Sequence, residues 1–190
     1  MEILLSISIG LGLSAAVGFR IFVPLLVMSI ASRADVLALG SSFEWIASTP
    51  ALIAFALATL VEVGAYYLPV VDNALDAIAG PVAVVAGIVV SASVIGDIDP
   101  FLKWTLAVIA GGGVAGTVQA LTTGTRGAST VSTLGLGNPL LSTLEFGGST
   151  VLSIVAILLP FLALALVIAL ITALFVLTRK LFGRRSAAEA

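Results

Sequence analysis

The stretch that decides the fold runs from residue 10 to residue 30 and reads GLGLSAAVGFRIFVPLLVMSI. Arg20 is its only charged residue, and the apolar sequence extends on both sides, over residues 3–32. A helix needs about 20 mostly apolar residues to cross the hydrocarbon core of a bilayer. The stretch therefore predicts a membrane-spanning helix that carries one charged side chain.

The composition of the whole chain agrees with this prediction. Of its 190 residues, 60% are apolar and 9% are charged, and the mean hydropathy is +1.26. Soluble domains average about 45–50% apolar and about 25% charged residues. We therefore expect an integral membrane protein. A net charge of −2 argues against nucleic-acid binding. Cysteine and histidine are absent, so we predict no metal site, no cofactor and no enzymatic activity.

Five stretches are long and apolar enough to suggest an all-α protein with five transmembrane helices. The third is the shortest, so a re-entrant or interfacial segment stays open as an alternative there. Ser48 and Asp99 precede prolines and are predicted helix caps. We treat residues 1–178 as one polytopic membrane domain and residues 179–190 as a basic cytoplasmic tail. The five predicted spans are residues 3–32, 50–68, 81–96, 100–123 and 150–178.

The distribution of Lys and Arg predicts the orientation, because cytoplasmic loops carry the excess of these residues. The tail is strongly basic, which places the C-terminus inside the cell. Counting back through five spans puts the loop at Arg33 and residues 97–103 inside as well. We therefore expect a multi-pass protein of the bacterial cytoplasmic (inner) membrane, with its N-terminus outside. The basic residues of the tail are Arg179, Lys180, Arg184 and Arg185.

Residues 10–60 align without a gap with residues 111–161. Because one span separates the two copies, the second copy would enter the membrane from the opposite side. The alignment predicts an inverted two-helix repeat around a short central helix, an arrangement that places transporter sites near the midplane. Breaks are predicted at 18–24, 111–113 and 124–127, although membrane glycines often serve only close packing. Identities in the alignment include Gly10/Gly111, Ser41/Ser142, Glu44/Glu145, Ser48/Ser149 and Thr49/Thr150.

Two charged residues lie inside predicted spans. A charge at the bilayer centre costs about 2.5–3.5 kcal/mol on insertion scales, so Arg20 and Glu62 each need support. Glu62 is a candidate cation or proton site, and Arg20 is a candidate counter-charge or anion contact. Alternatively, Arg20 snorkels or pairs with a helix end, and Glu62 is protonated within the bundle.

Further acidic residues lie near predicted helix ends. Asp72 and Asp76 are four residues apart and would share one face of a short interfacial helix, where Asp72 acts as a cap or the pair binds a hard cation. Glu44 and Glu145 each precede a Ser-Thr pair that would open a span, so capping is their first interpretation. Symmetric vestibules at the two glutamates are the functional alternative.

A polar stretch follows the fourth predicted span, from Gln119 through Arg126 to Asn138. Irregular polar backbone at membrane depth is tolerated where it lines water or is buried in protein. We therefore predict that this stretch lines a pore or cavity. The candidate residues of the substrate or ion pathway are Arg20, Glu62, Asp72, Asp76, Gln119, Arg126, Asn138 and Glu145.

Several short motifs occur in a recognisable order. With them the chain resembles the bacterial integral-membrane family catalogued as domain of unknown function 4126, from about residue 10 to residue 167. The resemblance implies a membrane protein of uncharacterised activity. The motifs are Gly18-Phe19-Arg20, Val61-Glu62-Val63, residues 71–76, Asn138-Pro139 and residues 142–145.

The chain departs from the family pattern by having fewer charges. Tyr66-Tyr67 stands where family members often have an Asp-Lys pair, and Phe146 stands where an acidic residue is common. Basic or histidine residues common near Gln119 and Thr122 are absent. This implies a different substrate or a reduced function if the family uses those groups.

Three functions remain. The first is a small transporter or channel for an ion or small polar solute, working among membrane lipids as a homo-oligomer, with a dimer favoured. The second is a membrane scaffold or assembly protein without transport, whose polar residues hold helices together. The third and least favoured is an intramembrane enzyme acting on lipid phosphates, with Arg20 or Arg126 holding phosphate.

Overall fold

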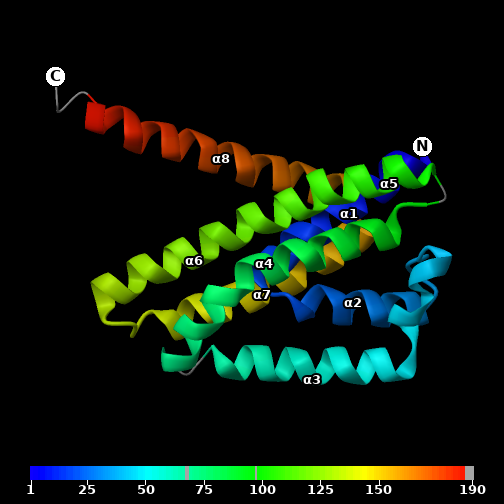
Figure 1. Cartoon of the computed structure of the whole chain (residues 1–190), viewed down its shortest axis with the longest axis horizontal. Coiled ribbons are helices and arrows are strands. Elements are labelled where there is room, and N and C mark those ends of the chain that lie inside the picture. Colours follow the sequence, from blue (N-terminus) through cyan, green and yellow to red (C-terminus); the bar gives the residue numbers. More distant parts are fainter. Residues whose placement is uncertain (67–68, 97, 187–190) are drawn as a thin grey trace.

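The structure is a computed structural model that describes residues 1–66, 69–96 and 98–186, without the side chains of residues 69–74, 76–77 and 174–186. The described part is entirely helical (Figure 1). In chain order the helices are α1 (Glu2–Phe19), α2 (Phe22–Arg33), the 3₁₀ helix η1 (Ser41–Ala47), α3 (Thr49–Ala65), α4 (Pro69–Val94), α5 (Pro100–Leu106), the π-helix η2 (Ala107–Gly112), α6 (Gly113–Thr133), α7 (Asn138–Leu158) and α8 (Pro160–Ser186).

Three helices in the described residues are long and apolar enough to cross a membrane, namely Glu2–Phe19, the continuous Pro100–Thr133 and Asn138–Leu158. A fourth is obtained if η1 and α3, which meet at 61°, count as one span. Large apolar side chains are exposed on their outer faces, and these would face lipid. The helices are those of a membrane protein, although the predicted set of five spans does not match them one to one. Shorter apolar helices are Phe22–Arg33, Ile78–Val94 and Pro160–Ala173.

The first predicted span, residues 3–32, is wrong because the chain reverses at Arg20. Arg20 is extended, with φ −147° and ψ 126°, and it separates α1 from α2. On α1, Gly12 lies against Ala156 of α7, while Arg20 reaches Ser142 near the start of α7, so α1 and α7 are antiparallel. From this end α2 runs back alongside α7 until its last turns reach Ile154. The predicted interruption between residues 18 and 24 is confirmed, and its result is a helical hairpin.

A second reversal corrects the last predicted span, residues 150–178. Helix α7 ends at Leu158, because Pro160 has no N–H to continue the helical bonds. Gly12 of α1 lies against both Ala156 of α7 and Ala163 of α8, and Val167 packs with Ala15 and Val118 further along. Helix α8 therefore returns beside α1 and parallel to it.

The two reversals change the arrangement of the basic residues. The loop at Arg33 and the start of α5 at Lys103 lie near one another, since Arg33 bonds to Ala47 and Gly40 lies beside Lys103. Figure 1 shows this end together with the N-terminus, whereas the last turns of α8 lie at the opposite end. The prediction that Arg33, Lys103 and the C-terminal tail share one side is therefore wrong.

Several other boundaries also differ from prediction. Helix α4 begins at Pro69 and continues through Pro81, so residues 70–78 do not form a separate interfacial helix and Pro81 starts no span. Helix α6 is continuous through residues 124–127, without the predicted break. The glycines at 111–113 do coincide with an irregularity, since the π-helix η2 ends at Gly112.

Two of the predicted caps are confirmed. The Ser48 hydroxyl accepts a hydrogen bond from the Ala51 N–H at 3.3 Å, and the Asp99 carboxylate accepts one from the Leu102 N–H at 3.1 Å. Each bond satisfies one backbone donor that the first turn leaves unpaired. The starts of α3 and α5 are therefore encoded locally.

Helix α1 is the centre of the bundle, and small residues let its neighbours approach closely. An added Cβ at Gly18 would come within 2.5 Å of the Val118 Cβ, and one at Gly10 would come within 2.9 Å of the Ser91 hydroxyl. Ser14 donates a hydrogen bond to the Gly87 carbonyl at 2.9 Å, and Ser149 donates one to the Ala16 carbonyl at 2.9 Å. Membrane helices commonly pack through such small residues and hydroxyls.

The aligned segments of the predicted repeat differ in local structure. Residues 10–33 form the hairpin of α1 and α2, whereas residues 111–134 lie in one nearly continuous helix. Ser48 caps α3, but its aligned partner Ser149 is buried inside α7. The alignment therefore does not identify equivalent helix ends in these segments.

Candidate functional site

Four charged side chains are buried together where the chain reverses between α1 and α2, and we call them the charged cluster. Arg20 and Arg126 are 1% and 2% exposed, and Glu62 and Glu145 are also buried. They come from four places in the chain: the reversal between α1 and α2, the last turns of α3, the second half of α6 and the first half of α7. When all four are ionised, two positive and two negative charges balance within the protein.

Glu145 binds both arginines. Its Oε2 accepts from Arg20 Nη2 at 3.2 Å, its Oε1 accepts from Arg126 Nε at 3.1 Å, and Arg126 Nη2 also contacts Oε2. Arg20 Nη2 donates further to the hydroxyl of Ser142 at 2.6 Å and to its carbonyl at 3.2 Å. The two-pronged contact of Arg126 is the strong geometry for a guanidinium and a carboxylate. Glu145 thus joins α6 and α7 to the α1–α2 junction, and its predicted capping role is wrong.

Glu62 binds the backbone at the start of α2. Its Oε1 accepts the Ile21 N–H at 2.8 Å, and its Oε2 accepts the Phe22 N–H at 3.1 Å. The first N–H groups of a helix lack partners within the helix and carry partial positive charge. Because Arg20 is extended, these donors face α3 and not a preceding helical turn. The carboxylate of Glu62 therefore stabilises the helix break between α1 and α2, close to Gly18.

Tyr66 follows the last residue of α3, and its ring contacts both buried arginines. The Cζ atoms of Arg20 and Arg126 lie 4.0 Å and 3.9 Å from the centre of its ring. Cations placed over an aromatic face are stabilised by its quadrupole, more so where water is excluded. The sequence reasoning treated Tyr66 only as a departure from a family pattern. Its spacing of four residues from Glu62 was the available signal, since such residues share one helix face.

The other predicted pathway residues are placed less centrally. Gln119 donates to the Thr123 hydroxyl at 3.1 Å, and Asn138 donates to the Thr130 hydroxyl at 3.0 Å. The polar stretch that contains them is helical through Thr133, which corrects the prediction of irregular backbone. Asp72 and Asp76 belong to α4, but their side chains lie outside the described residues. Glu44 is exposed on η1.

Two cavities adjoin the charged cluster. The larger, of about 410 Å³, lies between the start of α2, α3 and α4, and is lined by Ile21, Glu62 and Tyr66 together with apolar residues. The smaller, of about 170 Å³, lies between the end of α1, α6 and α7, and its lining includes Phe19 and Glu145. Phe19 and Ile21, on either side of Arg20 in the chain, thus line different cavities. Arg20 itself lies between them.

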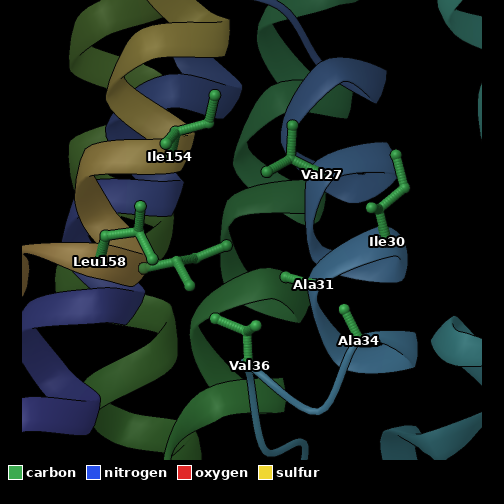
Figure 2. Close-up of a pocket in the computed structure, with 8 residues that line it drawn as sticks. Val27, Ile30, Ala31, Ala34, Val36, Ile154 and Leu158 are labelled. Carbon is green, nitrogen blue, oxygen red and sulfur yellow. The ribbon is translucent and has the colours of Figure 1, made fainter.

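A separate groove of about 320 Å³ runs between α2 and α7 (Figure 2). Figure 2 shows Val27 and Ala31 on one side and Ile154 and Leu158 on the other. All of its described lining side chains are apolar. Its described lining therefore contains no polar side chain that could bind a solute.

The model of one protein family matches residues 7–180, which is most of the chain. The chain belongs to the family described as Domain of unknown function (DUF4126). The predicted resemblance is therefore confirmed. No curated protein and no solved structure matches the chain.

The DUF4126 match includes every residue of the charged cluster, from Arg20 to Glu145. Among the described residues of this DUF4126 protein, no group of three or more His, Cys, Asp or Glu side chains is placed to hold a metal ion. The site consists of paired charges, a tyrosine and helix ends. Its arginine and carboxylate groups compensate one another's charge through direct contacts.

Proposed function

We propose that this protein is a small membrane transporter or channel for an ion or small polar solute, and that the charged cluster is its site. The observation that carries the proposal is the position of the cluster: four buried charged side chains meet at a helix break between two cavities. Ionisable residues within membrane helices are costly and mark substrate or ion pathways by default.

The helix break supports the same function. Transporters commonly form their sites from discontinuous helices, whose free N-termini bind negative groups near the middle of the membrane. Here the free N-terminus of α2 binds the carboxylate of Glu62. Arg20 and Arg126 contact both Glu145, which lines the smaller cavity, and Tyr66, which lines the larger. Passage of a solute would require these pairs to rearrange, so the cluster would act as both site and gate.

We also propose a multi-pass arrangement in a bacterial cytoplasmic membrane, with the basic tail inside and the N-terminus outside. The four basic residues at positions 179–185 support this orientation. The opposite positions of the N-terminus and the end of α8 agree with it (Figure 1). Arg33 and Lys103 would then lie on the outer side. A homodimer would supply further helices to enclose a pathway.

Flux through proteoliposomes tests the transport proposal. Wild type, Glu62→Gln and Arg126→Gln are reconstituted in equal amounts, and uptake of inorganic and organic ions is followed. We expect both substitutions to reduce flux, while Glu44→Gln, which changes an exposed glutamate, leaves it unchanged. Flux that is equal in wild type, Glu62→Gln and Arg126→Gln would contradict the assignment of the site.

A non-transporting scaffold is the second candidate, and one observation favours it. The hydrogen bonds, ion pairs and ring contacts of the charged cluster link α1, α2, α3, α6 and α7, as those of a purely structural network would do. In that case the substitutions would lower stability with no flux in any sample. Reproducible capture of one membrane protein by the wild type, lost in variants that fold normally, would support the scaffold.

A further inference from the structure

We propose that the larger cavity, between α2, α3 and α4, binds an organic cation with an apolar body. This inference rests on the proposed function, because it names the class of ion that the site would take. It comes from three features of the cavity: its apolar walls, its opening towards the lipid-facing surface and the carboxylate of Glu62 at its inner end.

The walls select for an apolar ligand. Helices α3 and α4, with the start of α2, enclose a space of about 410 Å³. Its rim carries Val61 and Ile78, which are 70% and 59% exposed, as well as Leu57 and Val82. In a membrane these side chains would face hydrocarbon, so the cavity would open sideways into the bilayer. A ligand that enters this way must be soluble in lipid.

The inner end selects for positive charge. Among the described residues that line the cavity, Glu62 is the only one that carries a charge when ionised, and Tyr66 lies beside it. Each carboxylate oxygen can accept two hydrogen bonds, and the described backbone N–H bonds use one on each. Neither Arg20 nor Arg126 is among the described lining residues. A cationic head can therefore approach the Glu62 carboxylate, whereas the negative charge of that carboxylate would repel an anion.

The combination defines the ligand more narrowly than either feature alone. An inorganic cation would leave the apolar walls without contacts, and a neutral lipid chain would leave the carboxylate without an ionic partner. An apolar body with a delocalised positive charge satisfies both parts of the cavity. Burial of its apolar surface would supply most of the binding free energy, and Glu62 would supply selectivity for the sign of the charge.

Binding of tetraphenylphosphonium to the purified full chain in detergent micelles tests this inference. Equilibrium dialysis measures binding, with protein-free micelles as the blank. Tetraphenylborate has the same shape and the opposite charge. We expect saturable binding of the phosphonium and about tenfold weaker or undetectable binding of the borate. Equal binding of the two ions would overturn the inference and indicate a non-selective lipid-chain cavity.

Two substitutions locate the site, with Glu44→Gln as the matched control. Glu62→Gln should weaken phosphonium binding about tenfold and abolish the preference over the borate. Ala58→Phe fills the cavity without altering a charge, and it should abolish binding even if Glu62→Gln folds poorly. Phosphonium binding that is unchanged in both variants would contradict the assignment.

The outcome separates this inference from the proposed function. Phosphonium binding that depends on Glu62, without flux of any ion, would support the cavity as a binding site and contradict transport. Flux of inorganic ions that depends on Glu62, without phosphonium binding, would support transport and contradict the organic cation.

Discussion

The cationic side chains at the two ends of the molecule are supported in different ways. At one end Arg20 and Arg126 are buried and bonded to Glu145. At the other end Arg33 is exposed and donates to the Ala47 carbonyl at 2.9 Å, while Lys103 lies 5.5 Å from the Phe43 ring centre. A buried charge must be paired inside the protein, whereas water and lipid headgroups solvate an exposed one. We therefore expect the buried charges to be sensitive to substitution and the exposed charges to tolerate it.

The largest expected effect comes from removing the carboxylate that both buried arginines share. Glu145→Gln removes the negative charge that both Arg20 and Arg126 contact, and breaking such a buried pair costs about 3–5 kcal/mol. The free energy of unfolding in mixed detergent micelles measures the loss. Glu44→Gln should have almost no effect. A similar small effect of Glu145→Gln would remove the difference between the two ends.

Substitution of Glu62 should have the next largest effect. In Glu62→Gln the side chain keeps one acceptor oxygen and loses the negative charge. One of the two N–H groups at the start of α2 therefore loses its acceptor. Leaving a buried donor unsatisfied costs about 1–3 kcal/mol. Hydrogen exchange provides the readout, because the amides of Ile21 and Phe22 should lose protection more than those in the middle of α7. Uniform loss of protection, or none, would show that Glu62 does not cap α2.

Tyr66 should contribute less, through its ring. Tyr66→Phe keeps the ring and should retain most of the stability, while Tyr66→Leu should lose about 1–2 kcal/mol, as expected for desolvated cation–π contacts. The same unfolding assay compares the two variants. Equal losses would attribute the effect to the hydroxyl, and equal stability with wild type would mean that the ring is not needed to hold the arginines.

The smallest effect is expected at the exposed end. Arg33→Ala removes bonds to the Ala47 carbonyl and the Thr49 hydroxyl, both at the surface. Surface substitutions of this kind usually change the free energy of unfolding by less than about 0.5 kcal/mol. A loss as large as that of Glu145→Gln would show that the exposed end is also a structural network.

Sequence reasoning identified the class of protein and much of the site. The apolar runs indicated membrane helices, and Arg20 and Glu62 were predicted site residues because charges inside such runs need partners. Arg126 was predicted from the polar stretch after the fourth span, and Glu145 from the repeat alignment. It did not find the pairing, because hydropathy does not say where a helix reverses. The run across Arg20 and the run across Pro160 each looked like one segment, and each is a turn between two helices.

The repeat alignment also misled at specific residues. It assigned Glu145 to a cap by analogy with Glu44, whereas Glu145 is the centre of the ion pairs. Ser142 and Tyr66 carry no charge, so a prediction based on charged residues did not include them in the site. Helical spacing was the signal, since Ser142 precedes Glu145 by three residues and Tyr66 follows Glu62 by four.

A double-mutant cycle on Arg126 and Glu145 tests the central claim most directly, which is that buried opposite charges are coupled across α6 and α7. Arg126→Met, Glu145→Gln and the double variant are unfolded in mixed micelles, and their free energies are compared with wild type. We predict a coupling energy of at least about 1.5 kcal/mol. Effects that add to within about 0.5 kcal/mol would contradict a shared buried cluster.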